Sequence, residues 1–505
     1  MNMCFHFRRA VLIGLGWLLL SGSTARPLAA APANQLQLPV ARVHWLGMKQ
    51  ISADINSARA MKVWHLPETA AMVSQTLDKI SRLPGHGTTN AASALLRPLL
   101  DDLLTSESYL EVYAAPTQHP ATSNLQLLLA LRLPPDRARL WQANLPAALP
   151  EAVVSPDGEW TLIGLGAGTA AMLPSLSSAI RHTSPSTLWL EADLSPAGLV
   201  AMSPTDLSAL HLPFSTFSHL HLTATGEADK VRTVAALDFS RPLTTTLPRW
   251  EVPKELVHQP LTSFTAVRGL AAWLATVPAW QDLQIAPAPD QVFGWALPGS
   301  PFQTYFAAPL PSASNQLTQL AGRLVPNGNS WLATNEAMGK FLWSAKSATL
   351  VWKNAFILSP FLAPATDHQR DYVLGGLIPR MEANLNSNPS AAEFFNQVLS
   401  PPNLVYFQGE QTGRRIADGF YNLQALRLIF HKPQLALNSG TAGAWLKKIA
   451  PLLDSSTTLV TRSGPQQLYF SRESTIGFTA LELQILVDWL ESPQFPSGLH
   501  TLSVQ

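Results

Sequence analysis

The sequence predicts an α+β fold made of repeated strand-strand-helix-strand-strand-helix units, with antiparallel sheets that carry helices on one face. Three observations lead to this class. Short apolar segments, some alternating with polar residues, are separated by turn residues, as in antiparallel strands. Prolines precede segments with helical periodicity. The same order of strands, turns and helices recurs along the chain, which indicates an internal repeat.

The first unit shows the clearest strand pattern. Leucine occupies alternate positions from Leu125 to Leu133, as on one face of a strand. Pro134 and Pro135 fit the first turn of a helix, and Gly158 supplies the positive φ that a tight turn requires. We therefore predict strands at 109–112, 125–133, 153–154 and 160–165, helices at 134–145 and 170–181, and a preceding helical pair at 70–80 and 99–104.

The second and third units repeat this order with different residues. In the second, a tight turn at Asn327-Gly328 is expected to lead to a strand at Trp331. At the next junction, Asp367 fits the N-cap of a helix running through Leu374 and Met381. Further strands are predicted at 292–297, 302–307, 404–407, 426–430, 459–461 and 468–471, and helices through 317–320, 442–453 and 480–490. The alternative is that the recurrence reflects only the usual succession of elements in α+β domains.

The repeat and the proline-rich stretches divide the chain into four predicted segments. Prolines cluster at 242–260 and 278–289, and such stretches fit linkers because proline gives up a backbone donor. The predicted segments are a signal peptide at 1–31, N-terminal helices with the first α+β unit at 32–245, the second unit at 246–365 and the third unit at 366–505.

The beginning of the chain is typical of a secretory signal peptide. Arg8 and Arg9 end a basic stretch, apolar residues follow at 10–20, and small residues occupy 29–33. The apolar stretch is short for a bilayer span, which takes roughly 20 residues, so cleavage within 25–33 is favoured over a retained anchor. We expect a mature protein that is periplasmic or extracellular, with no membrane span after cleavage. The alternative is a retained N-terminal anchor.

Composition excludes several classes of function. The 34 basic and 33 acidic residues nearly cancel, so no strong field attracts nucleic acid. The single cysteine, Cys4, lies in the predicted signal peptide, so the mature chain would have no disulfide, thiolate nucleophile or cysteine zinc site. The sequence contains no G-x-S-x-G, S-x-x-K or H-E-x-x-H motif, which removes the common serine hydrolase, penicillin-binding and zincin signatures.

One glycine motif resembles a dinucleotide-binding fingerprint in its spacing. Residues 166–171 read G-x-G-x-x-A between a predicted strand and a predicted helix, and Glu191 lies where a ribose-binding acid would be. The corresponding junction at 474–480 leads into a similar helix with one glycine, where Thr479 and Glu482 form a capping box. We therefore interpret the motif as structural, with Thr169 as a helix N-cap, and assign no cofactor.

Two polar pairs are candidates for chemistry. His219 and His221 share one face of a predicted strand, a spacing that can hold a metal ion. A hairpin turn at 226–229 would place Ala236 and Val234 opposite them, so no metal site is assigned. Adjacent Asp101 and Asp102 project about 100° apart on a helix, which indicates a solvated face and not an acid/base pair. The tryptophans at 160 and 331 are expected in core positions, although tryptophans can also stack on sugars.

Several stretches resemble a group of uncharacterised exported proteins from Verrucomicrobia-like bacteria. These stretches are HWLG at 44–47, the run at 64–79, LRPLLDD at 96–102, PLTSFTAVRG at 260–269 and the run at 477–490. The resemblance spans most of the mature chain. It implies export and a shared architecture, and it implies no activity and no site residues.

These features favour an exported, non-catalytic envelope or periplasmic protein that binds an unknown envelope protein or a polymer through its sheets. The alternative is an exported hydrolase of peptides or glycans with a dispersed active site. The hydrolase would require a deep pocket with serine, histidine and an acid within hydrogen-bond reach, or paired carboxylates. No catalytic, cofactor-binding or metal-binding residue is assigned from the sequence.

Overall fold

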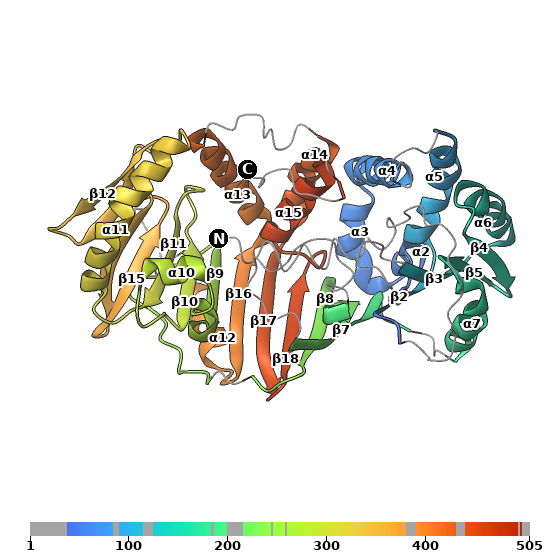
Figure 1. Cartoon of the computed structure of the whole chain (residues 1–505), viewed down its shortest axis with the longest axis horizontal. Helices are drawn as coiled ribbons and strands as arrows, with labels where there is room; N and C mark the ends of the chain where they lie inside the picture. The colour runs from blue at the N-terminus through green and yellow to red at the C-terminus, as the bar shows by residue number, and fades with distance from the viewer. Residues whose placement is uncertain are drawn as a thin grey trace. The chain divides into compact units, whose positions relative to one another are not determined.

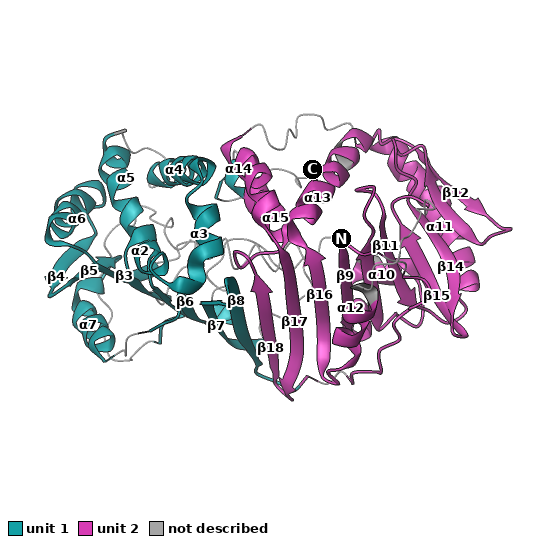
Figure 2. Cartoon of the chain, turned by 180° about the vertical axis from the view of Figure 1, so that it is seen from behind, with its two compact units in different colours: residues 1–242, 489–505 teal, residues 243–488 magenta. Residues whose placement is uncertain are grey.

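The computed structural model describes residues 38–83, 90–114, 125–182, 186–198, 216–243, 246–257, 260–379, 390–430, 440–492 and 495–496. The chain forms two compact units, which are residues 1–242 with 489–505 (unit 1) and residues 243–488 (unit 2) (Figure 2). Both units combine helices with antiparallel strands, so the predicted α+β class is confirmed. The predicted signal peptide at 1–31 lies outside the described residues.

Unit 1 is built on an antiparallel sheet. Its strands are β1 (Ala41–Trp45), β2 (Ser108–Ala114), β3 (Leu125–Arg132), β4 (Val153–Asp157), β5 (Trp160–Leu165), β6 (Leu190–Leu194), β7 (Phe217–Glu227) and β8 (Lys230–Phe239). Their pairings give the order β4-β5-β3-β2-β1-β6-β7-β8. The first strand, β1, therefore lies between β2 and β6, which are both far from it along the chain.

Helices cover both faces of the unit 1 sheet at β3. The helices are α2 (Met48–Ile51), α3 (Ala58–Trp64), α4 (Pro67–Ser81), α5 (Asn90–Thr105), α6 (Pro135–Ala148) and α7 (Leu173–Arg181). Leu129 and Leu131 pack with residues of α5 and α6, whereas Leu128 and Ala130 pack against α7. The two helices α6 and α7 lie on opposite sides of these strands (Figure 1). The prediction that helices cover only one face of the sheet is wrong here, because β3 is apolar on both faces.

Unit 2 is also built on an antiparallel sheet. Its strands are β9 (Ser263–Arg268), β10 (Gln291–Ala296), β11 (Thr304–Pro309), β12 (Lys340–Ser344), β13 (Thr349–Lys353), β14 (Phe361–Asp367), β15 (Arg370–Gly376), β16 (Leu404–Gln411), β17 (Ser455–Gly464) and β18 (Gln467–Ser474). They follow the order β12-β13-β14-β15-β11-β10-β9-β16-β17-β18. Phe264, Phe293 and Phe407 of the central strands are fully buried and form the centre of the core.

Unit 2 also contains helices, and residues of two of them, Leu317 and Phe395, pack in core clusters with its strands. The helices are α9 (Ala271–Leu274), α10 (Pro278–Leu283), α11 (Ala313–Thr334), α12 (Ser390–Leu399), α13 (Thr412–Ile429), α14 (Thr441–Ile449) and α15 (Ala480–Glu491), the last of which crosses the unit boundary. Across the described parts of both units, none of the helices has the length and apolar character needed to cross a bilayer.

The strand orders of the two units correspond. The order β4-β5-β3-β2-β1-β6-β7-β8 is matched by β14-β15-β11-β10-β9-β16-β17-β18, and unit 2 adds the hairpin β12–β13. A helix also follows the third strand in each case, α6 after β3 and α11 after β11. The predicted three-fold repeat of strand-strand-helix-strand-strand-helix is not confirmed, and the correspondence instead relates two larger units.

The predicted turn at Asn327-Gly328 is wrong, because both residues lie inside the helix α11. The apolar periodicity of Leu317 and Leu320 continues to Leu332, which is also buried, so the segment stays helical. Gly328 is needed for a different reason: a Cβ atom there would lie 2.8 Å from the ring of Phe341 on β12.

Two further predicted elements of unit 2 are wrong. The expected strand at 426–430 falls almost entirely in helix α13, where Ala425 and Ile429 are buried one helical turn apart. The expected helix after Asp367 is a β-hairpin between β14 and β15. His368 and Gln369 form its two-residue turn with φ of 45° and 66°, the left-handed values that such a turn requires.

Two glycines of α11 provide a matched test of this fold. We expect Gly328→Ala to lower the free energy of unfolding by about 1–3 kcal/mol, because the added methyl group overpacks against Phe341. Gly322 has open space around its Cβ position, so Gly322→Ala should raise stability by about 0.5–1 kcal/mol through helix propensity. Urea denaturation measures both changes, and equal losses in the two variants would contradict the helix.

Candidate functional site

One face of the unit 1 sheet carries a continuous set of polar side chains. Directly opposed residues of antiparallel strands share a face. The register places Arg42 of β1 opposite Asp193 of β6, which in turn is opposite His221 of β7. In the neighbouring row, His44 of β1 is opposite Glu191 of β6. Three strands that are distant in sequence therefore bring basic, acidic and histidine side chains together.

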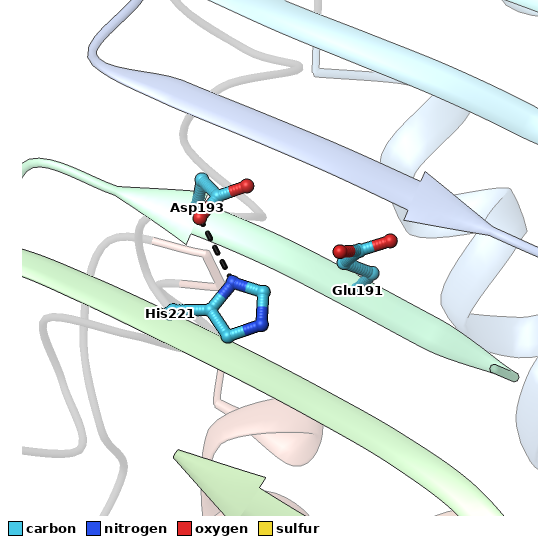
Figure 3. A group of neighbouring side chains, drawn as sticks. All are labelled: Glu191, Asp193 and His221. Atoms are coloured by element: carbon cyan, nitrogen blue, oxygen red, sulfur yellow. Dashed lines mark hydrogen bonds and ion pairs between the residues drawn. The ribbon is translucent and has the colours of Figure 1, made fainter. Parts of the chain in front are cut away.

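Five residues of this face form a histidine–carboxylate cluster, defined as Glu191, Asp193, His219, His221 and Asp238. His221 Nδ1 lies 2.9 Å from Asp193 Oδ1, and His219 Nε2 lies 3.2 Å from the same oxygen. His219 Nδ1 lies 3.6 Å from Asp238 Oδ2. Figure 3 shows Glu191 and Asp193 on one strand and His221 on the next, with their polar atoms grouped. Metal-ligating atoms of these three residues lie within 4.8 Å of one another.

The expected register of the His219–His221 hairpin is wrong by two residues. The expected register pairs His219 with Ala236 and His221 with Val234. Ala228 and Asp229 form the turn instead, so His219 is opposite Asp238 and His221 is opposite Ala236. Local sequence also gave no sign of Asp193, which comes from the strand on the other side of β7. The cluster has the ligand types of a metal site, but Asp193 Oδ1, the oxygen that both histidines approach, already accepts a hydrogen bond from His221.

A hollow of about 470 Å³ lies at one end of the same face. Its lining includes Glu107, Tyr109, Arg132, Asp157, Glu159 and Trp160. His44 joins the hollow to the cluster, because its ring stacks on Tyr109 at 4.1 Å between centroids and it is opposite Glu191 in register. The hollow and the cluster therefore belong to one surface, which we call the polar face of unit 1.

Arginine and other donors hold the carboxylates of the hollow. Glu107 Oε1 lies 3.1 Å from His44 Nε2, and Glu107 Oε2 accepts from Arg132 Nη1 at 2.9 Å and from Gln50 at 3.0 Å. Arg132 Nη2 also donates to Glu159 Oε1 at 2.5 Å. Asp157 accepts hydrogen bonds from Ser177 and Arg181.

These contacts lower the pKa of all three carboxyl groups. Burial alone would raise the pKa of Glu107, but hydrogen bonds from His44 and Gln50 and the charge of Arg132 bring it below its usual value. The hydrogen bond from Arg132 lowers the pKa of Glu159, and the hydrogen bond from Ser177, with that from Arg181, lowers the pKa of Asp157. A general acid working near neutral pH needs a raised pKa, so these groups are unsuited to that role.

Two aromatic rings complete the wall of the hollow. The rings of Tyr109 and Trp160 meet edge to face at 5.4 Å, and the guanidinium of Arg132 lies 5.5 Å from the centroid of the Trp160 ring. Burial and the charges of Glu107 and Glu191 raise the pKa of Tyr109 to about 12, so its phenol stays protonated. Trp160 is partly buried and packs against the core cluster of Leu128 and Leu162. Trp331 is 49% exposed, so the core position expected for it is wrong.

The glycine motif at 166–171 forms a turn between antiparallel elements. Strand β5, which precedes it, pairs antiparallel with β3 and β4, so the parallel β-α-β context of a dinucleotide site is not present there. Gly166 and Gly168 have φ of 104° and 80°. Thr169 is not an N-cap as expected, because its Oγ1 donates back to Gly166 O at 2.8 Å. Glu191, at the spacing where a dinucleotide site would have its ribose-binding acid, belongs instead to the histidine–carboxylate cluster.

The structure confirms the predicted capping box and the predicted role of Asp101, and it contradicts the predicted exposure of Asp102. Thr479 and Glu482 form the expected capping box, with Thr479 N donating to Glu482 Oε2 at 2.6 Å. Asp101 pairs with Arg97 at 2.9 Å on an exposed surface, as expected. Asp102 is instead buried and accepts hydrogen bonds from Arg137 and Trp141, because the 100° offset along α5 turns it towards α6.

No family model matches this chain, and the comparisons with curated proteins and with solved structures also give no match.

Glu107 makes the stability of unit 1 depend on pH. Its pKa in the folded state is below the unfolded value of about 4.3, so its stabilising contribution is present above that pH and is lost as the pH falls through the folded value. We expect Glu107→Gln to cost about 1–3 kcal/mol at pH 7, since charge-assisted hydrogen bonds are lost.

The difference between Glu107→Gln and the unsubstituted chain should shrink as denaturation is repeated towards about pH 3. Glu151→Gln, at an exposed position outside the hollow, is the matched control and should have little effect. The same loss of stability at every pH would contradict a role for the Glu107 charge.

Proposed function

We propose that this protein is an exported, non-catalytic protein of the cell envelope or periplasm, and that the polar face of unit 1 binds a partner protein or a polymer. One observation carries the proposal: Glu107, Asp157 and Glu159 are each paired with an arginine and have lowered pKa values. Such groups serve well as fixed charges and hydrogen-bond acceptors for a ligand. They serve poorly as proton donors in catalysis.

The chemistry of the hollow supports binding of a polar ligand. Trp160 and Tyr109 offer apolar ring surface, and Arg132 and Glu159 beside them offer charged donors and acceptors. Aromatic rings next to a few placed polar groups are common in sites that recognise sugars or peptides. The polar face extends beyond the hollow along the strand rows to His221, which suits an extended ligand.

The alternative is an exported hydrolase of peptides or glycans. The Asp193–His221 pair, at 2.9 Å, favours it, because an acid that orients a histidine base is part of a catalytic triad. The register does not supply the nucleophile, since the residues opposite His221 on its two neighbouring strands are Asp193 and Ala236. The binding function is therefore the better supported of the two.

Export is supported by the sequence features of residues 1–31 and by the resemblance to exported proteins. We expect the mature protein from native cells to begin within residues 25–33 and to fractionate with the periplasm or the medium. Mass spectrometry of the purified N-terminus checks the cleavage. A chain that keeps Arg8 and Arg9 and sediments with membranes would instead favour the retained anchor.

Trp160 provides the test of binding. We expect the mature chain to co-sediment with isolated envelope fragments and Trp160→Ala to weaken this association about tenfold or more, as loss of an aromatic anchor does. Trp331→Ala removes an exposed tryptophan of unit 2 and should leave the association unchanged. It is the control for nonspecific adsorption through an exposed aromatic side chain.

The same preparations separate binding from hydrolysis. The proposal expects no new reducing ends and no new amino termini when the mature chain is incubated with envelope fragments. Release of such products, abolished by His221→Ala or Glu159→Gln, would contradict the non-catalytic proposal and favour the hydrolase.

A further inference from the structure

Three side chains of unit 2 converge beside the β14–β15 hairpin. Asp367 ends β14, His368 is the first turn residue, and Glu255 comes from the segment at 254–257. Metal-ligating atoms of the three lie within 4.8 Å of one another. His368 Nε2 lies 3.6 Å from Glu255 Oε1 and 3.6 Å from Asp367 Oδ1.

Asp367 is the unusual member of this group. It is only 2% exposed, and its Oδ2 accepts a hydrogen bond from the Glu255 backbone N–H at 3.2 Å. Its Oδ1, which faces His368, is buried and has no hydrogen-bond partner among the described residues. The 3.6 Å distance to His368 Nε2 is too long for a hydrogen bond. A buried carboxylate oxygen that accepts no hydrogen bond is costly, and an imidazole 3.6 Å away offsets that cost only when it is protonated.

The distances from His368 to the two carboxylates fit a small cation between them. Ligand atoms of a tetrahedral zinc site lie about 2.1 Å from the ion and so about 3.4 Å from one another. The two 3.6 Å separations are close to that value. Two carboxylates and an imidazole are ligands typical of divalent transition metals. The nearest arginine of the hairpin, Arg370, is paired with Glu251 at 2.6 Å.

We propose that Glu255, Asp367 and His368 bind a divalent transition-metal ion such as Zn²⁺. The ion supplies the positive partner for Asp367 Oδ1 and links the segment at 254–257 to the β14–β15 hairpin. Glu255 and His368 are exposed by 62% and 71%, so solvent reaches the site and completes the coordination. This site is separate from the polar face of unit 1 and does not depend on the function proposed for it.

Zinc titration of the untagged, chelator-treated mature chain tests this site. We expect one saturable Zn²⁺ site in calorimetry and a thermal midpoint that rises with added Zn²⁺. Glu255→Gln and His368→Ala, at exposed positions that should not disturb folding, should each weaken Zn²⁺ binding about tenfold or more. Asp367→Asn should do the same. His221→Ala is the matched control and should leave this binding unchanged.

Two outcomes overturn the proposal. The first is a chain that shows no saturable Zn²⁺ binding. The second is Zn²⁺ binding that survives Glu255→Gln and His368→Ala; if His221→Ala then abolishes it, the ion belongs to the histidine–carboxylate cluster of unit 1.

Discussion

The placement of β1 between β2 and β6 is the constraint on which unit 1 depends. These antiparallel pairings join segments that are far apart in sequence and set which side chains meet. Side chains alternate between the two faces of a strand, so a slip of one residue would send His44 and Arg42 to the opposite face. The apolar residues Ala41 and Val112, packed together in one cluster, hold the register in place. The polar face exists only because this register is kept.

In the polar face, a poorly accessible carboxylate is stabilised by a neighbouring arginine. Glu107 is poorly accessible to solvent, and an unpaired carboxylate there would be costly. Arg132 offsets that cost and at the same time holds Glu159, so one guanidinium organises both acids and lies over Trp160. The result is a charged surface whose carboxyl groups have lowered pKa values, which suits recognition better than proton transfer. The corresponding strands of unit 2 instead bury Phe264, Phe293 and Phe407, so similar strand order does not imply a similar surface.

Local patterns in the sequence predicted much of the secondary structure. Alternating leucines predicted β3, and Pro134-Pro135 predicted the start of α6, because both signals depend on neighbouring residues only. Asn327-Gly328 predicts a turn, but glycine is required there because a side chain would collide with Phe341, a contact between a helix and a strand. The partners of His219 and His221 were missed for a similar reason, since Asp193 reaches them from β6. Residues that meet through long-range pairing leave no local signal, and the polar face of unit 1 is assembled by such pairing.

The most direct test of the account is the pKa of Glu107, measured by NMR titration of ¹³C-labelled glutamate carboxyl groups and assigned with Glu107→Gln. We expect a pKa below the usual value of about 4.3, because His44, Gln50 and Arg132 stabilise the charged form. A value near 6 or above would make Glu107 a competent proton donor and would contradict the view of the polar face as a non-catalytic binding surface.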